Sequence, residues 1–184
     1  LLNSQFYYRG LASIVGSDGR DRLVDIISFC LMPNHFHFVL RQKKERGIPI
    51  FMQKIGTGFT MYFNIKNKRS GSLFQGTFKA IHIDKQNYLD KIISYLHFNP
   101  ADLKEPKWKE KGIKNWEKIY NFIENYNWSS YGFFLGDNRF KTILNSNLIC
   151  DLFGSLNKQN RIGKDFINGK LEYLKEYMID SIEV

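Results

Sequence analysis

The sequence is poor in cysteine, in long apolar runs and in acidic residues relative to basic ones. Its 184 residues include two cysteines, Cys30 and Cys150, which lie far apart and form no CxxC motif. This usage argues against a disulfide framework and fits a reducing cytoplasm. No apolar run is long enough to span a bilayer and no secretory signal is visible, so we expect a cytoplasmic protein without a membrane partner.

The deficit of acidic residues leaves a strong positive charge. The chain has 27 Lys and Arg against 18 Asp and Glu, a formal net charge of +9. Such an excess favours a polyanionic partner, and nucleic acid is favoured over membrane because no basic amphipathic helix stands out. Aromatic residues make up 16% of the chain. Rings interleaved with basic residues suit single-stranded DNA, although the 16 Phe fit a hydrophobic core equally well.

The most informative stretch is the apolar run at 36–40 with the two histidines at its start, His35 and His37. The run is typical of a buried strand, and side chains alternate between the two faces of a strand. His35 and His37 are therefore predicted to point the same way. Two neighbouring imidazoles on a rigid strand can hold a metal ion, but they can equally be two satisfied core histidines.

A second feature is a predicted helix at 85–98, which carries Tyr95 and is followed by Asn99 and Pro100. Residues four apart share a helix face, so Tyr95 and Asn99 should project together, whereas His97 should point away from them. Pro100 disfavours further helix. Taken alone, Tyr95 is one of 10 tyrosines and fits a core position.

Four motifs in order give the chain a resemblance to a known family. They read MPNHFH at 32–37, GSLFQGTF at 71–78, YLHFNPA at 95–101 and WSSY at 128–131. The first is the His-hydrophobic-His pattern, and together the motifs cover most of residues 31–131. The chain resembles the single-tyrosine HUH transposases, and most closely the branch called REP-associated tyrosine transposases.

The resemblance implies an α+β fold of the ferredoxin-like or RRM-like type, with a central antiparallel sheet, helices packed on it and a C-terminal helical extension. Residues 1–101 would be the catalytic core, and residues 102–184 would pack the WSSY segment and the extension on it. We also expect strands at 5–10 and 73–84 and a helix at 165–182. The crossover after Gly10 looks too short, so either this member is trimmed or, as we favour, residues are missing near Gly10 and Leu11.

The same resemblance implies the chemistry. His35, His37 and Asn99 would hold a divalent metal, Mg²⁺ or Mn²⁺, which offsets the charge of the scissile phosphate. Tyr95 would be the nucleophile that forms a 5′-phosphotyrosine and releases a 3′-hydroxyl, which can later rejoin a strand. The bond energy is conserved, so no ATP is needed, and the chain has no glycine-rich phosphate loop.

The implied partner is single-stranded DNA with a hairpin from a repetitive palindromic element, bound by a monomer or a homodimer. The predicted DNA contacts are Arg9, Arg41, Lys68, Arg69, Phe74, Gln75 and Lys79. Thr77 stands where the family commonly has Arg, which weakens one phosphate contact. Two alternatives of other classes are a domesticated DNA-binding protein that has lost cleavage and a metal-dependent hydrolase that uses water. A rolling-circle initiator or relaxase shares the tyrosine chemistry.

Overall fold

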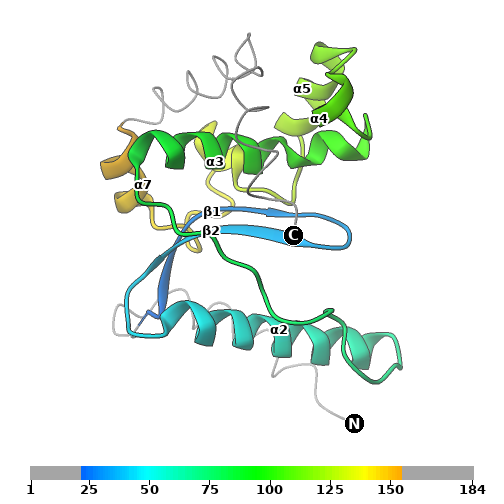
Figure 1. Ribbon diagram of the computed structural model, residues 1–184, viewed down its shortest axis with the longest axis vertical. Coiled ribbons are helices and arrows are strands. Elements are labelled where there is room, and N and C mark those ends of the chain that lie inside the picture. The colour runs from blue at the N-terminus through cyan, green and yellow to red at the C-terminus, as the bar shows by residue number, and fades with distance from the viewer. Residues whose placement is uncertain (1–21, 155–184) are drawn as a thin grey trace.

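The structure is a computed structural model that describes residues 22–154, and a β-hairpin lies at its centre (Figure 1). β1 (Val24–Leu31) and β2 (Phe36–Gln42) pair antiparallel, with a register irregularity between Ile26 and Ser28. The Met32 N–H donates to the His35 carbonyl at 2.8 Å and closes the turn. Pro33 lies in that turn, where its missing N–H removes no bond from the strand ladder.

One face of the hairpin packs on α2 (Gly47–Lys66), which lies below the strands in Figure 1. The ring of Phe51 on α2 is 5.9 Å from that of Phe38 on β2. Phe36 lies on the same face two residues earlier, and its ring is 5.6 Å from that of Phe74. Aromatic side chains of alternate β2 residues thus form the contact with α2 and with the chain that follows it.

The opposite face is covered by α3 (Gln86–Phe98). Leu89, Ile93 and Leu96 recur at helical spacing on α3 and are all buried in the main apolar cluster. This cluster also takes in residues of β1, among them the fully buried Cys30. Burial of this stripe fixes which side of α3 faces the sheet.

A second apolar cluster forms beyond α3. The chain passes through a 3₁₀ helix, η1 (Asn99–Leu103), and then through α4 (Trp108–Lys111) and α5 (Trp116–Glu124). Buried side chains from these elements pack together and against the end of α3; they are Phe98, Ala101, Trp108, Ile119, Ile123 and, from farther on, Tyr131.

The chain then returns to the free edge of β1. Ser129 forms an antiparallel bridge with Cys30, and the Ser130 N–H donates to the Phe29 carbonyl at 2.9 Å. After α6 (Tyr131–Phe134) the chain bridges β1 again and enters α7 (Ser146–Phe153). β1 therefore has backbone partners along both edges, with β2 on one side and the C-terminal part of the described chain on the other.

The predicted α+β arrangement, with helices packed on a central antiparallel sheet, is confirmed. The predicted strand at 73–84 is wrong, because these residues form bends and irregular chain and pair with no strand in the described part of the protein. Gly71 and Gly76 have positive φ angles of 91° and 89°, which turn the backbone away from an extended path. The predicted strand at 5–10 and helix at 165–182 lie outside the described residues.

Within residues 22–154, no helix combines the length and the apolar character needed to cross a membrane.

Candidate functional site

The two histidines of the His-x-His motif lie side by side, as the alternation of a strand predicts. Their ring centroids are 4.9 Å apart, with an angle of 86° between the ring planes. His35 is exposed in the turn, and His37 is half-buried on β2. The Asn34 Oδ1 lies 2.7 Å from the His35 Nδ1. Since an amide oxygen can only accept, Nδ1 carries the proton and Nε2 has the lone pair that a metal ligand needs.

The imidazoles are on the face of the hairpin that α3 covers. His37 is the cross-strand partner of Cys30 on β1, and Ser28 lies two residues before Cys30. The three side chains therefore share one face. The Ser28 Oγ is 2.9 Å from the Nε2 of His97 on α3, which places α3 on that face.

His97 joins three separate parts of the chain. Its Nε2 lies 2.9 Å from the Oγ of Ser28 on β1 and 2.8 Å from the Oγ of Ser130, and the two hydroxyl oxygens are 2.9 Å apart. Burial lowers the pKa of His97 to about 3, so the imidazole is neutral near pH 7. A neutral ring can form this network without a buried charge.

Tyr95 on α3 and Asn99, which caps the C-terminus of α3 in a helical backbone conformation, project from the other flank of the helix. Each is two residues from His97, a rotation of about 200° around the helix axis at 3.6 residues per turn. The flank that carries His97 is directed at Ser130, which lies along the edge of β1 away from β2. The flank with Tyr95 and Asn99 is therefore the one on the β2 side, where His37 lies.

The position of Asn99 along the helix axis agrees with its placement on the β2 side. α3 and β1 run in the same direction in Figure 1. The step from His97 to Asn99, at the end of α3, therefore parallels the step from Ser28 to Cys30 along β1, and the partner of Cys30 is His37. Asn99 is 2% exposed, and its Nδ2 donates to the Leu96 carbonyl at 3.4 Å, so its Oδ1 is the atom suited to a cation.

Within the described residues, the set of side chains that could bind a metal beside the imidazoles is small. No three His, Cys, Asp or Glu side chains gather into a metal-binding group within residues 22–154. Burial raises the pKa of Cys30, beside His37, to about 12, which keeps the thiol protonated and a poor ligand. Two imidazoles and an amide oxygen fit a divalent ion that keeps open positions for phosphate oxygens and water.

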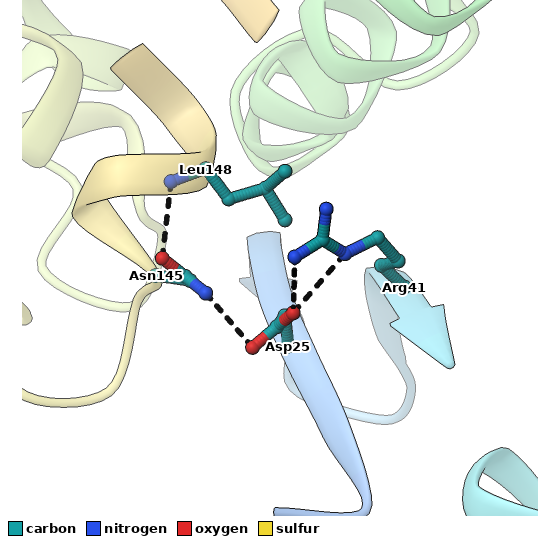
Figure 2. Close-up of polar contacts among 4 residues, drawn as sticks. All are labelled: Asp25, Arg41, Asn145 and Leu148. Carbon is teal, nitrogen blue, oxygen red and sulfur yellow. Dashed lines mark hydrogen bonds and ion pairs between the residues drawn. The ribbon is translucent and has the colours of Figure 1, made fainter. Parts of the chain in front are cut away.

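Arg41, a predicted DNA contact, is engaged within the protein. Its Nε and Nη2 donate to the carboxylate of Asp25 on β1 at 3.1 Å and 2.7 Å (Figure 2). Asp25 also accepts from the Asn145 Nδ2 at 2.8 Å, and the Asn145 Oδ1 accepts from the Leu148 N–H at the start of α7. The Arg41 side chain still exposes 52% of its surface, so it can also reach a phosphate.

The other described DNA candidates lie on the α2 side. Arg69 lies over the ring of Phe63 on α2, and Phe74 packs against Phe59 and Phe36. Lys68, Gln75 and Lys79 are exposed in the same part of the chain. Arg69 and Phe74 are thus on the side of the hairpin opposite the imidazole pair, and Arg9 lies outside the described residues.

Sequence reasoning missed the partners of His97 and Arg41. Ser130 belongs to the WSSY motif, which indicated packing against the core but not which atoms meet. Ser28 and Asp25 carried no signal, because a Ser or Asp in an otherwise apolar strand does not reveal its partner. Ser130 lies 102 positions from Ser28, and Asn145 lies 120 positions from Asp25.

The hairpin thus carries a histidine pair on the face that a tyrosine-bearing helix covers. Residues 2–99 match the model of the family described as "Transposase IS200 like", and the chain belongs to this family. Its function is therefore of the transposase type, its partner is DNA, and the family is generally metal-dependent. No curated protein and no solved structure matches the chain.

Proposed function

We propose that this protein cuts and rejoins single-stranded, hairpin-bearing DNA through a covalent link to Tyr95. The observation that carries the proposal is the pair of imidazoles, 4.9 Å apart, on the face of the hairpin covered by α3. The helix that covers them brings a tyrosine and an amide on its β2-side flank. Membership of the IS200-like transposase family supports this mechanism.

His35, His37 and Asn99 would hold a divalent cation, Mg²⁺ or Mn²⁺. Bound there, the cation would polarise the scissile phosphate and offset its negative charge. The Asn34 side chain orients the His35 ring, and the hydrogen bond from the Asn99 Nδ2 orients the amide. These contacts hold the ligand atoms in place before DNA arrives.

Tyr95 supplies the nucleophile. Its Oη forms the new bond to phosphorus, and the bond from phosphorus to the 3′ oxygen breaks. The phenol loses one proton and the departing 3′ oxygen gains one, so the products are a 5′-phosphotyrosine and a 3′-hydroxyl. Attack of a 3′-hydroxyl on the phosphotyrosine reverses the bonding changes, rejoins a strand and restores the phenol.

Tyr95 is 5% exposed, so the reaction requires a step that uncovers its hydroxyl to DNA. Phosphates would be bound by Arg41 and by the basic residues beyond α2, and bases would stack on Phe74. Arg41 shares the face of His37, whereas Phe74 and Arg69 are on the α2 side, so the strand must pass around the β2 edge to reach both groups. The protein would act as a monomer or a homodimer.

The burial of Tyr95 also favours a second candidate, a metal-dependent hydrolase in which water attacks and the tyrosine is structural. The two mechanisms differ in their products. A tyrosine nucleophile leaves protein joined to DNA, and a water nucleophile does not.

The test is incubation with hairpin oligonucleotides carrying a 5′ or a 3′ label and with Mn²⁺, followed by a denaturing gel. We expect a protein–DNA adduct in the wild type and in the control Tyr88→Phe, a change on the same helix, and none in Tyr95→Phe. Equal cleavage without adduct in all three proteins would establish the hydrolase. Binding with no cleavage would leave a DNA-binding protein that has lost its chemistry.

A further inference from the structure

A buried polar cluster lies beside the candidate site and takes no part in the chemistry proposed above. It consists of Ser28, His97 and Ser130, which are 0%, 4% and 0% exposed. The Nε2 of the histidine and the two hydroxyl oxygens form a triangle with sides of 2.8–2.9 Å. Buried polar groups are costly unless they are bonded, so three of them in contact require explanation.

Each corner of the triangle belongs to a different element. Ser28 is on β1, His97 is on α3, and Ser130 is on the segment along the outer edge of β1. Ser130 is itself fixed, because its Oγ accepts from the Phe29 N–H at 2.9 Å and donates to the Phe29 carbonyl at 3.1 Å. The triangle therefore ties α3 to a rigid point on the sheet.

Aromatic rings hold the imidazole from its other sides. The ring centroid of Tyr131 is 5.3 Å from that of His97, and the centroid of Phe134 is 5.0 Å away in an edge-on orientation. These ring contacts hold the His97 imidazole in the orientation in which its Nε2 faces the hydroxyls of Ser28 and Ser130. Any rotation of α3 about its own axis would break these contacts.

The apolar stripe of α3 cannot give the same restraint. Contacts of Leu89, Ile93 and Leu96 hold the helix on the sheet, but hydrophobic contact is non-directional and tolerates small rolls and slides. Hydrogen bonds depend steeply on angle and distance. The apolar contacts hold α3 on the sheet, and a satisfied buried hydrogen-bond network also fixes the orientation of the helix.

We propose that His97 is a positioning residue that sets the rotation and the axial register of α3, so that Tyr95 and Asn99 are directed at His37. The inference rests on the proposed function, because it assigns a role to the flank of α3 opposite the reacting groups. His97 acts only through the helix and touches neither the DNA nor the metal.

Two substitutions that replace the imidazole of His97 by an amide test whether the position of the hydrogen-bonding group matters or only its polarity. In His97→Gln the terminal amide reaches about as far as Nε2 and can bond to both hydroxyls. In His97→Asn the same amide group ends near the position of Nδ1 and falls short. Ser28→Ala removes one corner of the triangle, and with it two of the three contacts, but leaves the His97–Ser130 contact. Leu89→Ala destabilises the same helix two turns away from His97.

The first readout is the rate of adduct formation at saturating oligonucleotide, with DNA affinity measured separately and thermal unfolding used to confirm that each variant is folded. For His97→Asn we expect a rate at least tenfold below wild type with a DNA Kd within twofold. The rate of His97→Gln should be within about threefold of wild type, and the rate of Ser28→Ala should lie between those of the two His97 variants. Leu89→Ala should lose thermal stability but keep its rate at a temperature where it is folded.

The second readout needs no turnover. Tyrosines are replaced by 3-fluorotyrosine, the Tyr95 ¹⁹F signal is assigned from its loss in Tyr95→Phe, and Mn²⁺ is added without DNA. Bound Mn²⁺ should broaden this signal strongly in the wild type and in His97→Gln, and less in Ser28→Ala. Should His97→Asn not fold, Ser28→Ala and His97→Gln decide the question.

The outcomes are distinct. Equal rates and equal broadening in wild type and in the folded triangle variants would overturn the positioning role while the proposed function stands. A rate loss in Leu89→Ala as large as in the triangle variants would show that these variants act through loss of stability, and would overturn the positioning role as well. If wild type itself forms no adduct and shows no Mn²⁺ broadening, the proposed function fails, and the positioning role fails with it.

Discussion

Asp25 and Arg41 are directly opposed in the register of β1 and β2, and the guanidinium donates two hydrogen bonds to a carboxylate whose side chain is 0% exposed (Figure 2). Burial pushes the pKa of Asp25 upward, but the hydrogen bonds from Asn145 and Arg41 outweigh it, and the pKa lies below its ordinary value. The carboxylate is therefore charged at neutral pH, and the hydrogen bonds from Asn145 and Arg41 stabilise that charge. It joins the hairpin to the start of α7.

Removal of the Arg41 guanidinium should destabilise the fold. In Arg41→Met the buried carboxylate keeps Asn145 but is deprived of two donors, and we expect a decrease of about 1–3 kcal/mol in the free energy of unfolding. Lys54→Met removes one positive charge from an exposed position on α2 and is the control. Urea denaturation measures both variants, and equal midpoints would show that the ion pair contributes nothing.

DNA affinity should depend on the exposed basic residues beyond α2. Replacing Lys68 and Lys79 together by Gln should weaken binding of single-stranded DNA. It should also reduce the slope of log K against log salt by about 0.7 for each phosphate that the protein no longer neutralises. The matched control replaces Lys114 and Lys118, which are exposed near α5. A salt titration by fluorescence anisotropy that gives equal slopes for the two double variants would exclude this surface from the DNA path.

Two glycines of α2 should respond in opposite ways to alanine. A Cβ on Gly47 would lie 2.2 Å from the Leu23 carbonyl oxygen, which is backbone and cannot move aside without shifting the approach to β1. Gly47→Ala should therefore cost about 1–3 kcal/mol of stability. A Cβ on Gly58 meets nothing within 4 Å in the described part of the chain, and Gly58→Ala should gain about 0.5–1 kcal/mol.

Thermal unfolding of the two glycine variants provides the check. A higher Tm for Gly58→Ala and a lower Tm for Gly47→Ala would agree with the structure. A Gly47→Ala protein as stable as wild type would mean that α2 does not begin against Leu23.

Stability should fall in mild acid because of His97. Its pKa is lowered from 6.5 to about 3 in the folded protein, so between these values the unfolded chain binds a proton that the folded protein does not. The contribution of His97 is complete above pH 6.5 and is lost as the pH falls toward 3, by at most about 1.4 kcal/mol per pH unit. His97→Gln removes this dependence.

The measurement is the free energy of unfolding at pH 7.5 and pH 5 for wild type and His97→Gln. The difference between the two pH values should be larger in wild type. The remaining histidines are common to both proteins and cancel in the comparison. Parallel pH dependence in the two proteins would show that the folded protein accommodates a protonated His97.

Local pattern was enough to predict several features. The alternation of a strand predicted that His35 and His37 lie together, and the predicted helix at 85–98 corresponds to α3 (Gln86–Phe98). The helical spacing also predicted that His97 points away from Tyr95 and Asn99. The roles of these residues as ligands and nucleophile stay predictions, because they concern a metal and a DNA strand.

Pairing between distant segments could not be predicted in this way. The partner of Ser28 on α3 is 69 positions away, and nothing in either neighbourhood specifies the other. The error at 73–84 has the same origin. A stretch with several apolar residues is compatible with a strand, but a strand exists only where another backbone offers its hydrogen bonds.

The double-sided pairing of β1 has a consequence for synthesis on the ribosome. The chain that closes the outer edge of β1 leaves the exit tunnel about a hundred residues after the hairpin, since Phe29 and Ser130 are 101 positions apart. Until then, one edge of β1 presents unpaired backbone groups to any neighbouring chain. A transcript truncated before the codon for Trp128 would yield a product prone to aggregate, and a slow stretch of translation between the hairpin and Trp128 would prolong the same exposure.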